Sequence, residues 1–159
     1  MPDLLWDDVA DWFDPKEMGT LPDLRVPGAS VADWQAVLDL VRDSGLRYCY
    51  EEGDTVLPLP RAAPVLARLA GTECPNLSVW LAPGIVAIFR FYSDDEIDFD
   101  VDLRELQGQE RLDVLCGFLR SIGRRLDKPV LMDPEGAYGH PMLGYDPKTD
   151  RVLLLAAFD

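Results

Sequence analysis

The residues best suited to chemistry are four acids that alternate with hydrophobic residues: Glu96, Asp98, Asp100 and Asp102. Aspartates at this spacing begin a calcium-binding loop, which also needs a glycine at its sixth position and a bidentate glutamate at its twelfth. Leu103 and Gln109 occupy those two positions. Side chains on one face of a strand also lie about 7 Å apart along the chain, too far for all of them to hold one ion. We therefore expect a solvated acidic face and no metal site.

A single histidine, His140, limits the catalytic chemistry of the chain. It excludes a histidine-rich metal cluster, and no nucleophile motif such as Gly-x-Ser-x-Gly occurs. The glycines near it do not form a phosphate-binding loop, because no Gly-Lys-Ser/Thr follows them, and we expect no cofactor. One alternative stays open: a small carboxylate-dependent enzyme, or a small-molecule-binding protein, with a site near His140 and Asp133. In the enzyme, Asp98, Asp100 or Asp133 would meet His140 in a cleft.

The chain is strongly acidic. Its 159 residues include 29 Asp and Glu against 15 Lys and Arg, which gives a formal net charge of −14. This charge repels phosphate backbones and anionic lipids, so we expect neither nucleic acid nor a membrane as a partner. It suits solubility alone or the attraction of a basic protein.

The cysteines and the N-terminal residues predict a cytoplasmic protein. Cys49, Cys74 and Cys116 are odd in number and lack Cys-x-x-Cys spacing, so they indicate buried free thiols in a reducing compartment. Met1-Pro2-Asp3 shows no basic region or apolar core of a signal peptide. No apolar run approaches the roughly 20 residues that span a bilayer.

A three-stranded antiparallel meander over residues 76–103 is predicted to form the centre of the fold. Pro83-Gly84 is a tight-turn dipeptide between the first two strands, and Ser93-Asp94-Asp95 supplies turn residues before the third. Apolar residues at helical spacing predict helices over 31–44 and 108–126. We expect a single α+β domain, residues 1–159, with a mostly antiparallel sheet and both helices packed on its apolar face.

Two-residue turns in this meander place aromatic rings beside carboxylates on one face. With Pro83-Gly84 as the first turn, Trp80 pairs with Ala87; with Asp94-Asp95 as the second, Phe89 pairs with Asp100. Rings that anchor and charges that steer are typical of a protein-binding surface. The predicted protein-binding residues are Trp80, Phe89, Phe91, Asp94, Asp95, Glu96, Asp98, Asp100 and Asp102.

Two alternatives compete with this surface. An amphipathic helix over residues 3–13, rich in aromatic residues, would cover the rings if it packed on the same face. A one-residue bulge in the meander would reverse the assignment of side chains to faces.

Three segments carry a resemblance to a known class of proteins: Gly19-Thr20-Leu21-Pro22-Asp23-Leu24, Asp33-Trp34-Gln35 and Glu96-Ile97-Asp98-Phe99-Asp100. In this order the chain resembles small uncharacterised bacterial proteins of the immunity-protein type, from polymorphic toxin systems. The resemblance spans most of the chain and includes no catalytic motif. It implies a small, cytoplasmic, acidic and non-enzymatic protein that plugs or masks a toxin.

The leading hypothesis is therefore a non-enzymatic acidic domain that binds a basic protein, such as a toxin. The enzyme described above is the first alternative. A domain that self-associates through an exposed strand edge is the second, and the oligomeric state stays open.

Overall fold

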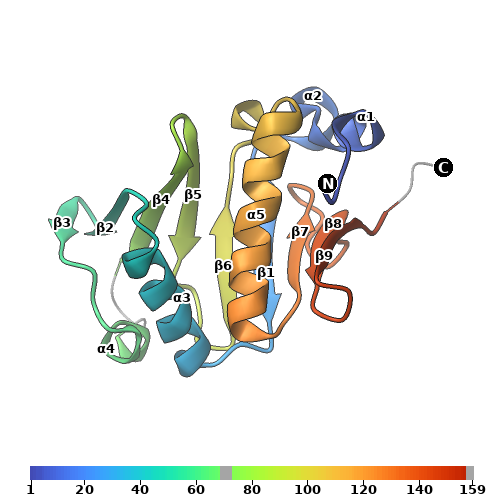
Figure 1. Ribbon diagram of the computed structural model, residues 1–159. Coiled ribbons are helices and arrows are strands. Elements are labelled where there is room, and N and C mark those ends of the chain that lie inside the picture. The colour runs from blue at the N-terminus through green and yellow to red at the C-terminus, as the bar shows by residue number, and fades with distance from the viewer. Residues whose placement is uncertain (69–72, 157–159) are drawn as a thin grey trace.

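The computed structural model describes residues 1–68 and 73–156, and within them nine strands form one sheet (Figure 1). The strands are β1 (Asp23–Pro27), β2 (Tyr48–Glu52), β3 (Thr55–Leu57), β4 (Asn76–Ala82), β5 (Ile85–Arg90), β6 (Glu96–Asp100), β7 (Val130–Asp133), β8 (Leu143–Asp146) and β9 (Arg151–Leu154). Their order is β3-β2-β4-β5-β6-β1-β7-β8-β9, and every neighbouring pair is antiparallel. The predicted α+β class with a mostly antiparallel sheet is confirmed.

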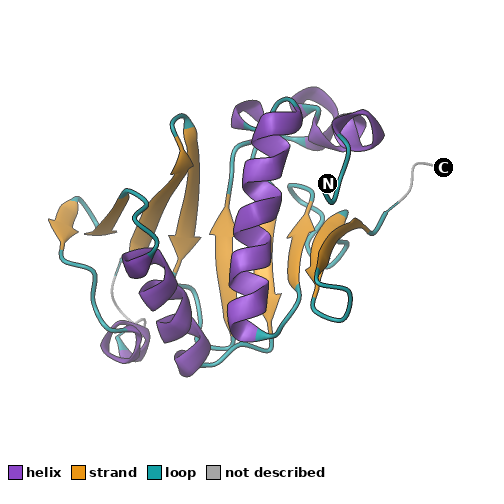
Figure 2. Cartoon of the chain, in the orientation of Figure 1, coloured by secondary structure: helices purple, strands orange, loops and turns teal. Residues whose placement is uncertain are grey.

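The helices of the described chain are α1 (Trp6–Val9), η1 (Ala10–Phe13), α2 (Pro15–Met18), α3 (Val31–Asp43), α4 (Ala62–Ala67), η2 (Leu103–Glu105) and α5 (Gln109–Leu126). The long helices α3 and α5 correspond to the two predicted ones. Both lie on the same side of the sheet, as the purple helices in front of the orange strands show in Figure 2. The predicted arrangement of helices on one face is confirmed.

Helix α3 begins where the sequence supplies a capping box. The hydroxyl of Ser30 accepts a hydrogen bond from the Asp33 backbone N–H at 3.1 Å, and the Asp33 carboxylate accepts one from the Ser30 N–H at 3.1 Å. These two bonds satisfy N–H groups that a helix start otherwise leaves unpaired. The buried residues of the helix recur at helical spacing and fix its orientation on the sheet: Trp34, Val37, Leu38 and Val41.

Helix α5 packs closely on the half of the sheet that contains β8. Its apolar stripe includes Leu112, Leu115, Leu119 and Ile122, all fully buried. Gly123 continues this stripe, and a Cβ atom there would overlap the ring of Tyr145 on β8. The missing side chain therefore lets the aromatic ring pack against the helix backbone.

The central meander has the predicted strands in a different register. β4 and β5 pair as Trp80–Val86 and Leu77–Phe89, with a β-bulge between Trp80 and Ala82. The bulge adds one residue to β4, and because side chains alternate, it turns β5 over relative to the prediction. In the next pair Phe89 lies opposite Phe99, because residues 91–95 connect β5 to β6 in place of a two-residue turn.

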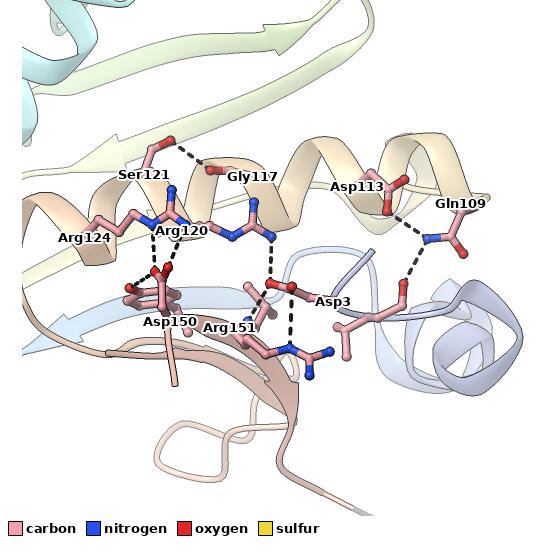
Figure 3. A network of polar contacts seen from close by, with 12 residues as sticks. Asp3, Gln109, Asp113, Gly117, Arg120, Ser121, Arg124, Asp150 and Arg151 are labelled. Carbon is pink, nitrogen blue, oxygen red and sulfur yellow. Dashed lines mark hydrogen bonds and ion pairs between the residues drawn. The ribbon is translucent and has the colours of Figure 1, made fainter. Parts of the chain in front are cut away.

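The N-terminal segment is fixed to α5 and to β9. Arg120 donates a hydrogen bond to Oδ2 of Asp3 at 2.6 Å, and the backbone N–H of Val152 donates to the same oxygen at 2.9 Å (Figure 3). The side chain of Gln109 accepts from the Trp6 N–H at 2.7 Å and donates to the carbonyl of Leu4 at 2.9 Å. These polar contacts therefore fix the segment to α5 and β9.

Candidate binding face

The face of the sheet opposite to α3 and α5 forms the candidate site. Leu77 and Phe99 on the helix-covered face are at most 2% exposed, whereas Ser78 and Asp98, their neighbours on the other face, are half-buried. The strand registers place ten side chains on the central part of this second face. We call them the open face: Asp23, Arg25, Ser78, Trp80, Val86, Ile88, Arg90, Glu96, Asp98 and Asp100.

Two ion pairs neutralise part of the charge on this face. Arg25 Nε donates to Oδ2 of Asp133 at 2.8 Å, and the side chain of Asp133 has no exposed surface. The backbone N–H of Gly139 donates to the same oxygen at 3.0 Å. Arg90 contacts Asp100 Oδ2 at 3.4 Å. The buried Arg25–Asp133 pair is thus fully engaged within the fold.

The loop over residues 134–141 folds back onto one end of the open face. The guanidinium of Arg25 lies 5.1 Å from the centre of the Tyr138 ring, within the range of a cation–π contact. The Tyr138 hydroxyl lies 2.7–2.8 Å from the two carboxylate oxygens of Glu96. Hydrogen bonding to this carboxylate raises the pKa of Tyr138 to about 12. The loop therefore engages Glu96 and leaves Asp98 and Asp100 beside it.

Carboxylates outnumber guanidinium groups on the open face, and their proximity changes their protonation. Burial raises the pKa of Asp98 to about 7, and the charges of Glu96 and Asp23 act in the same direction against the weaker effect of Arg25. The pKa of Asp23 is also raised, first by burial and then by Asp100. Both shifts are caused first by burial, and the neighbouring carboxylates add to them, so the acids of this face lie close enough to repel one another.

Two of the predicted binding residues are buried in the core. Phe89 and Phe91 are at most 1% exposed, and the prediction that their rings line the surface is wrong. Phe89 stacks on Phe99 with ring centres 4.6 Å apart, and Phe91 stacks on Trp34 of α3 at 4.5 Å. The β4 bulge is the physical reason, because it exchanges the two faces of β5.

Four of the remaining predicted residues lie together on the open face: Trp80, Glu96, Asp98 and Asp100. Trp80 is half-buried, and the guanidinium of Arg47 lies 4.2 Å from its ring centre. Asp94 and Asp95 are exposed in the loop that follows β5. Asp102 lies beyond the end of β6, where its carboxylate accepts from the Arg104 backbone N–H at 2.9 Å and caps η2.

His140 and Asp133 differ in exposure and in their contacts. The Asp133 carboxylate is enclosed by Arg25 and Gly139 N–H, while His140 is exposed on the loop surface. No group of three or more His, Cys, Asp or Glu side chains arranged to hold a metal occurs among the residues that the structure describes.

The three thiols are free, and they differ in exposure from what the sequence suggested. Cys116 is buried as expected, but Cys49 is only half-buried and Cys74 is exposed. Burial raises the pKa of all three, for Cys116 to about 12. Raised thiol pKa values are typical of structural rather than nucleophilic cysteines.

Sequence reasoning missed most of the non-acidic part of the open face: Arg25, Val86, Ile88 and Arg90. For Arg25 a signal existed, because Asp23 and Arg25 alternate with buried Leu24 and Val26, the pattern of a strand with one polar face. For β5 the apolar run offered no such signal, since hydrophobic residues occupy both of its faces.

Comparison with known proteins returned no match to a family model, to a curated protein or to a solved structure. Within the described residues, no helix combines the length and apolar character needed to cross a membrane.

Proposed function

We propose that the open face is a docking surface for a basic protein, and that the chain acts without catalysis by covering that partner. The observation that carries the proposal is the excess of carboxylates on the open face. Arg25 pairs with Asp133 and Arg90 with Asp100. Among the residues that the structure describes, Asp23 and Asp98 form no ion pair with a guanidinium group. A basic surface brought against them would supply the missing countercharge.

The composition of the face supports a protein partner over a small ion. Val86, Ile88 and the half-buried ring of Trp80 lie among the acids, so apolar surface is available for burial next to charge. Interfaces between proteins combine such an apolar centre with charges that steer the approach. The net charge of −14 extends the attraction over the molecule as a whole.

The mode of action that we propose is masking, as an immunity protein covers a toxin. In this mode the partner's own active or binding surface is occluded, and the chain itself needs no catalytic group. Two features support this mode. One face of the sheet is acidic and not covered by helices. Among the described residues, its carboxylates either form ion pairs within the fold or have no countercharge at ion-pair distance.

A charge-matched pair of double variants tests the docking surface, with a fluorescently labelled oligolysine peptide as the basic probe. Asp98→Asn with Asp100→Asn removes two acids from the open face. Asp43→Asn with Glu110→Gln removes two exposed acids from α3 and α5. We expect the open-face pair to weaken binding at low salt about fivefold, roughly 1 kcal/mol, and to flatten its salt dependence. We expect a clearly smaller effect from the helix pair.

Equal weakening by both pairs would contradict the proposal, because the peptide would then be responding to net charge alone. Once a purified native partner is available, the same variants extend the test. The open-face pair should slow association more than it speeds dissociation, since such charges mainly set the rate of approach. A partner that keeps its full activity in the complex would contradict the masking mode.

A further inference from the structure

A small hollow opens on the open face beside Arg90 and Asp100. Its volume is about 130 Å³, several times the roughly 30 Å³ that one water molecule occupies in the liquid. Part of its lining is aliphatic and part is charged. The lining residues are Leu21, Val86, Ile88, Arg90, Asp100, Val101, Asp102 and Glu105.

One oxygen of the Asp100 carboxylate, a residue that lines the hollow, has no hydrogen-bond donor among the residues that the structure describes. Oδ2 of Asp100 contacts Arg90 at 3.4 Å, but Oδ1 is buried and without a partner in the part of the chain that the structure describes. The other acids of the lining are already engaged. Glu105 Oε1 accepts from the Val86 N–H at 3.0 Å, and the Asp102 carboxylate is paired with Arg104 at 2.6 Å. A buried acceptor without a donor is unfavourable, so a donor from outside would be bound there.

The lining also indicates which donor fits. A lysine side chain has a four-carbon stem that packs on aliphatic surface and an ammonium group that donates to single acceptors. An arginine side chain gains most from a carboxylate that offers both oxygens to its planar guanidinium. At Asp100 one oxygen contacts Arg90 already, so a guanidinium could not pair with both oxygens in its bidentate geometry. Aliphatic walls with one free carboxylate oxygen therefore favour lysine.

We propose that this hollow binds a lysine side chain of the basic protein that docks on the open face. The proposal rests on the proposed function and assigns one specific contact within it. The aliphatic stem lies between Val86, Ile88 and Val101, and the ammonium group donates to Oδ1 of Asp100.

Nα-acetyl-lysine N-methylamide is the probe for this contact, titrated into the protein while the methyl NMR signals of Val86, Ile88 and Val101 are recorded. We expect these signals to shift, with a Kd on the order of 10 mM for so small a ligand. The norleucine analogue, which lacks the ammonium group, should not shift them, and the arginine analogue should bind several-fold more weakly. Asp100→Asn should weaken lysine binding about tenfold or more, because a charged acceptor is lost.

Asp43→Asn is the matched control, since it removes the same charge from the exposed end of α3, on the other side of the sheet, and should leave the titration unchanged. Methyl spectra of both variants without ligand show whether the fold is kept. If Asp100→Asn does not fold, the variant Ile88→Trp replaces it: the tryptophan fills the hollow and should abolish the shifts of the Val86 and Val101 signals. Equal binding of the norleucine or arginine analogue would overturn the proposal, as would lysine binding that survives both changes.

These outcomes separate this contact from the docking surface itself. If the lysine amide causes no shifts while oligolysine still distinguishes the two double variants, the hollow is not the lysine site and the docking surface stands. If the lysine amide binds as expected but oligolysine responds equally to both double variants, the hollow binds an ammonium group and the docking proposal fails.

Discussion

Arg25 and Asp133 form an ion pair across β1 and β7, with Nε and Oδ2 2.8 Å apart, although 108 residues separate them in the sequence. The side chain of Asp133 is fully buried and that of Arg25 is 11% exposed. A charge in this position depends on its partner, because neither water nor a distant ion can replace the guanidinium. The pair therefore links the stability of β1 to that of β7.

Arg25→Leu should lower the free energy of unfolding by about 3–5 kcal/mol, since it leaves the Asp133 carboxylate buried and unpaired. Adding Asp133→Asn should recover about 1–3 kcal/mol, because the buried charge is removed while an acceptor for the Gly139 N–H is kept. Urea unfolding of the two single variants and the double variant measures this coupling. Arg104→Leu is the control at an ion pair whose arginine is 66% exposed, and it should cost under about 1 kcal/mol.

Asp98 should make stability depend on pH in the neutral range. Its pKa is about 7 in the folded protein against an ordinary value of 3.8, so the folded state binds more protons between these values and stability falls as pH rises through them. Asp98→Asn should remove this slope. Partial exposure screens the effect, and we expect about 1–2 kcal/mol of added stability at pH 8, or a Tm higher by a few degrees.

Asp94→Asn serves as the control for net charge in these melts, because it lies in the exposed loop after β5. Thermal unfolding of both variants between pH 5 and pH 8 makes the comparison. An Asp98→Asn variant with the same slope as the unmodified protein would mean that the carboxyl group at Asp98 is ionised throughout this range.

Two glycines of α5 should respond to alanine in opposite directions. At Gly117 a Cβ atom meets nothing within 4 Å, so Gly117→Ala should stabilise the protein by about 0.5–1 kcal/mol through higher helix propensity. At Gly123 the added Cβ overlaps the Tyr145 ring, and Gly123→Ala should cost about 1–3 kcal/mol despite the same gain in propensity. Urea unfolding decides the signs, and stabilisation by both changes would show that α5 can move away from β8.

Asp3 should contribute to stability at neutral pH and lose that contribution in acid. Burial raises the pKa of Asp3, but hydrogen bonds from Arg120 and the Val152 N–H outweigh it and hold the pKa below its ordinary value. Its contribution is therefore present above that value and declines as pH falls through the lowered pKa. Asp3→Asn should cost about 1.5–3 kcal/mol at pH 7 and give a shallower decline in acid. Asp11→Asn, at an exposed position, is the control and should change little.

The sequence specified the helices and the outer strands of the meander because each carries a local pattern. Ser30 and Asp33 mark the start of α3, and alternation in β6 separates Ile97 and Phe99 from the acids between them. These features depend on residues close in sequence. The α+β class followed from them, and the structure agrees.

The face of β5 could not be read from sequence in the same way. Val86, Ala87, Ile88 and Phe89 are all apolar, so no alternation distinguishes the buried side from the open one. The bulge between Trp80 and Ala82 determines which side of β5 is buried, and this bulge depends on how the whole hairpin packs. The pairing of β1 with β6 and β7 also joins segments that are far apart in the sequence. This pairing brings Arg25, Asp98 and Asp133 together, so their proximity could not be predicted from local patterns.

The place of β1 in the sheet has a consequence during synthesis of the chain. β1 is made early, yet both of its neighbours, β6 and β7, are made late, and the Arg25–Asp133 contact waits for 108 further residues. At a translation rate of about 5–20 residues per second, that wait is roughly 5–20 s. Until β6 is made β1 has two unpaired edges, and until β7 is made it keeps one, with a strand sequence able to join other strands. The nascent chain therefore depends on whatever shields residues 23–27 until the ribosome has delivered their partners.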